Sequence, residues 1–433
     1  MESEKTIKPA NKKERKDSLP EKKGFLSLSL FLLLQGQFVS VMGDMIYEIA
    51  LGFWVLALTG SPALMGTLMA TSLLPAVLLS PFAGVVVDRY NRKKLMIVMD
   101  AIRGITIILV AAVAFMGLLE IWMVFLAGII LGICGAFFSP AATSVIPQMV
   151  PKDKLTNANS LFGMAYTGAD ILGNSIGGIL FALIGAPLMF LVNGISFIVS
   201  GASISFAQIP KSRESKITLD DFKSDIRESF SFIYNLKGLF YILLIFSISS
   251  FLAHIAIVLL IPLFQFTPGL GAAKYGVTIA SFTVGIFLGM IFLSIINVPS
   301  PKKAVVMFVS VTISNLCLVA FALITEFYLM VIMLFIAGIS GSVVNVFVIS
   351  SIQSIVPDNM MGKVMALVNT LIIALIPLAM IIGGVLAQFF PIRAIFMVCF
   401  LLGVLVFISL FFMPSVRKFI NFDPENQSIE DMM

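Results

Sequence analysis

A few ionisable residues of this sequence stand inside long apolar stretches. Asp44 and Glu48 lie four residues apart in the first such stretch, Asp170 lies in the fifth, and His254, the only histidine, lies in the seventh. An ionisable group inside a membrane is costly, so it usually faces a cavity or a partner. Carboxylates and an imidazole in such a place can bind a cation or exchange a proton. We therefore predict that these four residues bind substrate or couple its movement to protons.

Each of these residues also has a simpler interpretation, which the sequence leaves open. The two acids of the first stretch would form a polar patch if they lie near the membrane surface. Asp170 would be a hydrogen-bonding residue beside Tyr166 or a neighbouring helix, and His254 a neutral packing residue. Asp100 and Arg103 lie three residues apart, a spacing that lets two side chains pair on one helix face, and we predict a structural ion pair between them.

The composition predicts an all-α membrane protein. Of 433 residues, 59% are hydrophobic and only 12% are charged, which is more apolar surface than a soluble protein of this length can bury. A bilayer span needs about 20 mostly apolar residues. Twelve stretches meet that requirement: 25–57, 64–87, 95–117, 121–145, 158–183, 186–207, 238–265, 275–297, 304–324, 327–350, 364–388 and 394–413.

The basic residues predict the orientation of these spans. Of the 28 Lys and Arg, all but Arg103, Lys274 and Arg393 lie at the two ends of the chain or in alternate connections between spans. Cytoplasmic connections are enriched in Lys and Arg, so both termini are expected in the cytoplasm. The sequence pI near 9.0 follows from this topology and does not indicate a nucleic-acid partner.

Glycine and proline positions predict that the chain consists of two related halves. The following pairs recur at one spacing without a gap: Gly132 and Gly338, Gly135 and Gly341, Pro151 and Pro357, Gly177 and Gly383, Gly178 and Gly384. The spacing covers six spans, so the repeat is parallel. The predicted units are a basic cytoplasmic tail (1–24), a six-helix half (25–207), a cytoplasmic linker with an amphipathic helix (208–237), a second six-helix half (238–413) and a cytoplasmic tail (414–433).

The stretch GVVVDRYNRKK, residues 84–94, resembles the cytoplasmic loop motif of the major facilitator superfamily, Gly-x-x-x-Asp-Arg-x-Gly-Arg-Lys. Asn91 replaces a glycine of the motif, and asparagine is expected to keep a left-handed turn there. Four further stretches resemble the macrolide-efflux branch of that family: QGQFVSVMGDMIYEIALGFWV, GAFFSPAATSVIPQMVP, NANSL and VPDNMMGKVMAL. The residues that match the loop motif are Gly84, Asp88, Arg89, Arg92 and Lys93.

The resemblance implies a fold and an activity. It implies two six-helix halves around a central cavity, and alternating access that exports a small amphipathic, often cationic substrate in exchange for protons. It implies a monomeric protein of the bacterial plasma membrane that needs no cofactor beyond a proton gradient. It also implies that Asp88 latches the halves together near Gly362 and Lys363, with Arg89 and Arg92 binding anionic head groups or carbonyls.

Two positions depart from exporters of this family. Gly128 stands in the fourth span where many proton-coupled exporters carry an arginine, and Asn174 replaces the proline of the fifth-span Gly-Pro-x-x-Gly-Gly motif. An importer and a lipid or lysolipid translocase of the same fold remain alternatives. The sequence contains no phosphate-binding loop, which disfavours an ATPase, and no His/Cys metal cluster, which disfavours a membrane enzyme. No segment outside the spans is long enough for a soluble catalytic or sensing domain, which disfavours a membrane enzyme or a receptor.

Overall fold

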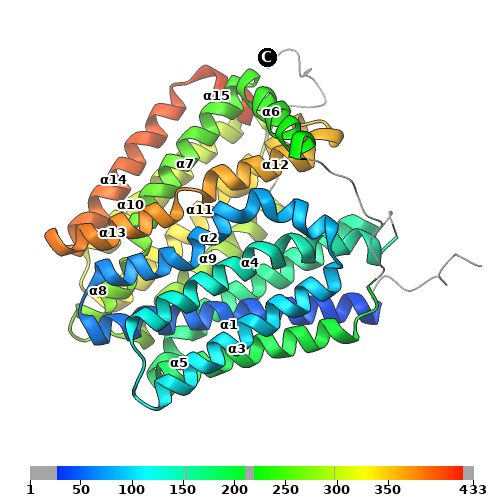
Figure 1. The fold of residues 1–433 in the computed structure, drawn as a ribbon. Helices are drawn as coiled ribbons and strands as arrows, with labels where there is room; N and C mark the ends of the chain where they lie inside the picture. The colour runs from blue at the N-terminus through cyan, green and yellow to red at the C-terminus, as the bar shows by residue number, and fades with distance from the viewer. Residues whose placement is uncertain (1–26, 152–153, 210–218, 297, 423–433) are drawn as a thin grey trace, which may run out of the picture.

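The chain folds as a bundle of long helices (Figure 1), described here from a computed structural model for residues 27–151, 154–209, 219–296 and 298–422. Within these ranges every regular element is a helix. The first half contains α1 (Leu28–Thr59), α2 (Pro62–Arg89), α3 (Arg92–Phe115), α4 (Ile121–Met149) and α5 (Leu155–Phe206). After α6 (Leu219–Asn235), the second half contains α7 (Lys237–Ile257), α8 (Leu260–Phe266), α9 (Ala272–Ile295), α10 (Lys303–Leu323), α11 (Phe327–Ile355), α12 (Asp358–Ile373), α13 (Ile376–Phe389), α14 (Ile392–Phe411) and α15 (Pro414–Ile420), with a short 3₁₀ turn, η2 (Ser300–Lys302), before α10.

Helix α5 supplies two spans, because the chain reverses inside it. Gly185 has φ 72° and ψ 173°, a conformation that only glycine adopts without strain. Before this turn, Gly177 packs against Ile49 in the later part of α1. After it, Ser200 packs against Gly36 near the beginning of α1. Eleven helical segments of the described residues are long and apolar enough to cross a membrane, and this reversal makes them twelve spans, as predicted.

Two spans of the second half are broken by proline. Helices α7 and α8 form one span interrupted before Pro262, and α12 and α13 form another interrupted before Pro377. Proline lacks an N–H and crowds the carbonyl four residues earlier, so each helix breaks about one turn before its proline. The broken spans touch each other, and Ser247 donates to the Leu371 carbonyl over 3.3 Å. A neighbouring hydroxyl thus helps to satisfy backbone near a break.

The predicted repeat appears as equivalent helix contacts. Gly132 brings α4 against α2, and its counterpart Gly338 brings α11 against α9. Gly178 brings α5 against α9 of the other half, and its counterpart Gly384 brings α13 against α2. These two pairs of glycines therefore recur because the same close approach of backbones occurs once in each half.

The two halves converge at one end of the bundle and separate at the other. One hydrophobic cluster contains buried residues of both halves, among them Phe53 and Leu259, and it lies toward the turns at Gly60 and Gly185. Toward the opposite end each half has its own cluster, built around Leu33 in the first half and Phe419 in the second. We call these the sealed end and the basic end; the ribbons diverge toward the basic end in Figure 1.

Two short helices cover the second half at the basic end. Helix α6 contacts α7 and α12, and its own Ile233 is buried. Residues expected to belong to a tail form α15, whose Val416, Phe419 and Ile420 are buried in the cluster of the second half. The linker helix and this part of the tail are therefore packed elements of the second half.

Candidate functional site

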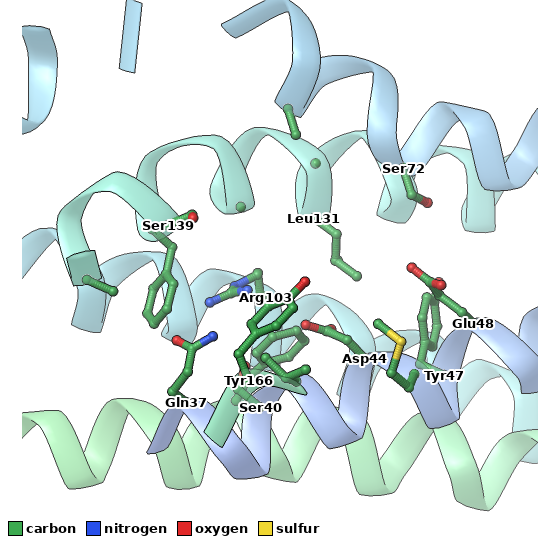
Figure 2. Close-up of a pocket in the computed structure, with 18 of the residues that line it drawn as sticks. Gln37, Ser40, Asp44, Tyr47, Glu48, Ser72, Arg103, Leu131, Ser139 and Tyr166 are labelled. Carbon is green, nitrogen blue, oxygen red and sulfur yellow. The ribbon is translucent and has the colours of Figure 1, made fainter. Parts of the chain in front are cut away.

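A cavity of about 340 Å³ lies within the first half, between helices α1, α2, α3, α4 and α5. Asp44 and Glu48 reach into it from α1, as Figure 2 shows, and Arg103 reaches into it from α3. The volume lies at the lower limit of known small-molecule pockets. The described lining residues all belong to the first half: Gln37, Ser40, Val41, Asp44, Met45, Tyr47, Glu48, Ser72, Leu73, Ala76, Arg103, Leu131, Gly132, Gly135, Phe138, Ser139, Ala142, Phe162, Tyr166 and Phe197.

The polar side of the cavity comes mainly from one stripe of α1. Gln37, Ser40, Asp44 and Glu48 follow one another at intervals of three or four residues and line the same space. Such spacing places side chains on one face of a helix. We predicted the two acids of this stripe as site residues, and the same spacing in the sequence extends toward the N-terminus to Ser40 and Gln37.

Arg103 is held in a fixed position by a buried partner and two aromatic rings. Its guanidinium pairs with Asp100, which is fully buried, so the predicted ion pair is present. The guanidinium carbon also lies 4.5 Å from the centroid of the Phe138 ring and 4.3 Å from that of Phe197. Such contacts between a cation and ring faces are attractive. The ion pair is therefore more than structural, because one of its members lines the cavity.

Gly128, which stands where many exporters carry an arginine, packs against α2. A Cβ atom at Gly128 would lie 2.8 Å from the hydroxyl of Ser72, so this hydroxyl would have to rotate away from any larger side chain. The cavity thus receives its positive charge from α3, through Arg103.

Asp170 lies beside the cavity rather than in its lining. Its carboxylate accepts a hydrogen bond from Asn174 over 3.1 Å, and it is near enough to Glu48 to interact electrostatically. Tyr166, one turn earlier on α5, does line the cavity. Asn174, which replaces a proline of the exporter motif, therefore holds Asp170 in place.

His254 lies in the second half and is not part of this cavity. Its Nδ1 lies 2.8 Å from the Ser250 carbonyl oxygen, so this nitrogen donates and Nε2 is left as an acceptor. The residue sits one turn before the break between α7 and α8. The structure therefore does not bring His254 together with Asp44 and Glu48.

Asn91 of the loop motif begins a helix instead of making a left-handed turn, so that expectation was wrong. Its φ is −67° and ψ is 106°, and its side chain accepts a hydrogen bond from the backbone N–H of Lys94 over 3.1 Å. Asparagine is among the preferred residues at the N-cap. The motif position thus starts α3.

Two basic residues of the motif tie helix ends together. Lys93 Nζ donates to the carbonyls of Ser205 and Ala207 over 2.7 and 2.8 Å, at the end of α5. Arg92 donates to the Ser144 carbonyl of α4 over 3.3 Å. Cations at helix C-termini stabilise the exposed carbonyls. These bases therefore hold α3 against α4 and α5, and the expected carbonyl contacts of Arg92 are present.

The proposed latch remains a prediction. Gly84 lies in the last turns of α2 with open space around it, while the side chains of Asp88 and Arg89 lie outside the described residues. At the other predicted partner, Lys363 Nζ lies 2.9 Å from the Glu228 carboxylate of α6. Lys363 is thus paired with the linker helix α6, and the two halves of the protein are separated at this end of the bundle.

Comparisons with known proteins agree with this architecture. Macrolide efflux protein A of Streptococcus pyogenes is 25% identical over 376 residues, which cover 85% of this chain and 91% of that protein. The protein of the same name from Enterococcus faecalis is 25% identical over 329 residues, covering 73% of this chain and 100% of that protein. The crystal structure of a bacterial homologue of the human lysosomal transporter Spinster shares the fold, with a TM-score of 0.63 at 15% identity, covering 92% of this chain and 97% of that one.

A family profile gives the assignment. The profile described as Major Facilitator Superfamily matches residues 33–376 and 301–428, which together include most of the described helices. The two six-helix halves, the parallel repeat and the loop motif agree with it. The chain belongs to the major facilitator superfamily.

Proposed function

We propose that this chain is a proton-coupled exporter of amphipathic, often cationic small molecules in a bacterial plasma membrane. The observation that carries the proposal is the cavity in which Asp44 and Glu48 face the same space. Two acids that face one cavity favour a positively charged ligand. The similarity to proteins named for macrolide efflux supports export of a drug-sized molecule.

The two ends of the bundle support an alternating-access cycle. The halves pack backbone to backbone at the sealed end, where Gly178 of α5 meets α9 and Gly384 of α13 meets α2. At the basic end each half keeps a separate hydrophobic cluster. A rocking motion of the halves would open the first end and close the second. Asp88 and the start of α12 would meet in that second arrangement.

Coupling follows from competition for the same carboxylates. Asp44 or Glu48 can hold either a proton or the charged amine of a substrate, but not both. A proton that arrives from outside then displaces the substrate, and a substrate that arrives from the cytoplasm displaces the proton. This exchange produces antiport, provided that the empty and unprotonated protein does not complete the rocking step.

The basic end is placed in the cytoplasm, with both termini. Bases such as Arg92 and Lys93 crowd that end, whereas the sealed end carries Lys274 and Arg393. Single cysteines at Ser215 and at Ser61 test this orientation by labelling with an impermeant maleimide in intact cells. Labelling at Ser61 alone is expected, and labelling at Ser215 alone would reverse the topology.

Transport itself is tested in inverted membrane vesicles that contain the chain. An imposed proton gradient, acid inside, should drive accumulation of a fluorescent cationic drug, and Glu48→Gln should abolish it. A panel of drugs in a bacterium lacking its own pumps would then define the substrates. Uptake in the opposite direction would indicate an importer, and competition by lysolipid head groups would indicate a lipid translocase.

A further inference from the structure

Four residues that line the cavity each carry a buried polar atom without a hydrogen-bond partner among the described residues. These are the Gln37 Oε1, Tyr47 hydroxyl, Ser72 hydroxyl and Arg103 Nε atoms. Tyr47 is 2% exposed and Arg103 is 6% exposed, so bulk water does not satisfy them. Buried polar groups in folded proteins are nearly always paired with protein, ordered water or ligand. Four such groups around one space indicate that a polar occupant belongs there.

The polar groups are divided between two sides of the cavity. Figure 2 shows Arg103 with Gln37 and Ser139 toward one side, and Glu48 with Ser72 toward the other. A bound molecule therefore meets the Arg103 N–H donor on one side and a carboxylate on the other. The ligand needs a hydrogen-bond acceptor at one end and a cation at the other end.

The charge balance decides which kind of acceptor fits. Arg103 is already neutralised by Asp100, its buried partner. Asp44 and Glu48 add negative charge to the same cavity. A carboxylate on the ligand would therefore meet an excess of negative charge, whereas an uncharged carbonyl oxygen can accept a hydrogen bond from the Arg103 guanidinium without that repulsion.

The donor is also rigid. The Phe138 and Phe197 rings hold the guanidinium of Arg103 between them, and Asp100 fixes one of its terminal nitrogens. A donor held in one orientation loses little freedom when a ligand binds. It can therefore discriminate between a ligand that carries an acceptor at the matching place and one that lacks it.

We infer that the preferred substrate is a monovalent amine that carries an uncharged carbonyl group at its opposite end. The amine lies toward Glu48, and the carbonyl oxygen accepts a hydrogen bond from the Arg103 guanidinium. The inference rests on the proposed function and names the class of molecule that the same cavity selects. A lipophilic cation without an acceptor, and a zwitterion with a carboxylate, are both poorer ligands.

Binding to the purified full-length protein in detergent tests this selectivity. Three probes share one tertiary amine and one aromatic ring. The first has an ester between them, the second has a methylene in place of the ester carbonyl, and the third ends in a carboxylate. The ester should bind about tenfold more tightly than either of the others, because a hydrogen bond from a charged donor is gained.

Three variants assign the selectivity to residues. Asp100→Asn with Arg103→Gln removes the donor without leaving a buried charge, and the ester should lose its advantage over the methylene probe. Gln37→Leu alters the same side of the cavity while keeping the ion pair, and should reduce that advantage. Glu48→Gln should weaken the ester and methylene probes alike.

Two results would overturn the inference. One is equal affinity of the ester and methylene probes for the wild type; the other is an ester advantage that survives in the double variant. Either result leaves the proposed function in place if Glu48→Gln still weakens both amines. Amine binding that is indifferent to Glu48→Gln would instead contradict the proposed function.

Discussion

Gly178 of α5 and Gly276 of α9 touch backbone to backbone across the two halves. A Cβ atom at Gly178 would lie 2.7 Å from the Gly276 nitrogen, closer than real Cβ atoms come to backbone. The same approach recurs at Gly384, where a Cβ atom would lie 2.9 Å from Ala63 Cα. The sealed end is therefore closed by positions that tolerate no side chain.

Gly178→Ala should loosen the sealed end. The added methyl group must push α5 and α9 apart, so the arrangement closed at this end loses population. A cysteine at Ser61, read by the rate of maleimide labelling, should react several-fold faster, and efflux should fall. Gly163→Ala is a matched control on the same helix, because open space surrounds that glycine. Unchanged labelling in Gly178→Ala would show that the contact does not hold the halves together.

Arg103→Gln should destabilise the protein strongly. It leaves Asp100, which is fully buried, without its counter-charge, and breaking a buried pair costs about 3–5 kcal/mol. The thermal midpoint in detergent should drop, and adding Asp100→Asn should restore most of it. A double variant as unstable as the single one would mean that the packing of Arg103 on its two rings matters more than its charge.

The embedded acids should differ in their effect on coupling. Glu48→Gln and Asp44→Asn remove carboxylates from the cavity lining and should each reduce drug-induced proton release by half or more. Asp170→Asn should be milder, because its carboxylate lies beside the cavity and is held by Asn174. The measurement is the pH change of a weakly buffered protein solution on addition of drug. Proton release equal to wild type in both cavity variants would exclude these acids as coupling groups.

Lys93→Gln should destabilise the first half by about 1 kcal/mol, through loss of two bonds to the carbonyls that end α5. Lys94→Gln is the matched control, since the Lys94 side chain is exposed and other bases remain in the turn. Thermal unfolding of the two variants should separate them clearly. Equal midpoints would indicate that the carbonyl contacts add nothing to stability.

The sequence predicted the twelve spans and the two halves because each depends on a local signal. Apolar length sets a span, and paired glycines such as Gly178 and Gly384 mark equivalent contacts. The reversal at Gly185 separates two of those spans although the helix is otherwise continuous there. The breaks near Pro262 and Pro377 also follow from local chemistry.

The lining of the cavity depends on which face each helix presents, and that depends on packing between helices. Asp44 and Asp170 look alike in sequence, since both stand inside apolar spans, yet only Asp44 reaches the cavity. The pairing of Asp100 with Arg103 was predictable from spacing within one helix. The position of Arg103 at the cavity was not predictable, because it depends on Phe138 and Phe197, which lie on two other helices.

The way in which the sealed end is closed determines how the protein tolerates its surroundings. Glycine backbones meet there, and Gln388 lies within 3.5 Å of the Ser61 hydroxyl across the halves. None of these groups titrates in the physiological range, and dissolved ions screen only charged pairs. On the proposed topology this is the outward gate, so acid or salt outside the cell should leave its closure unchanged. The external pH, and with it the proton gradient that drives transport, can then change without opening the outward gate.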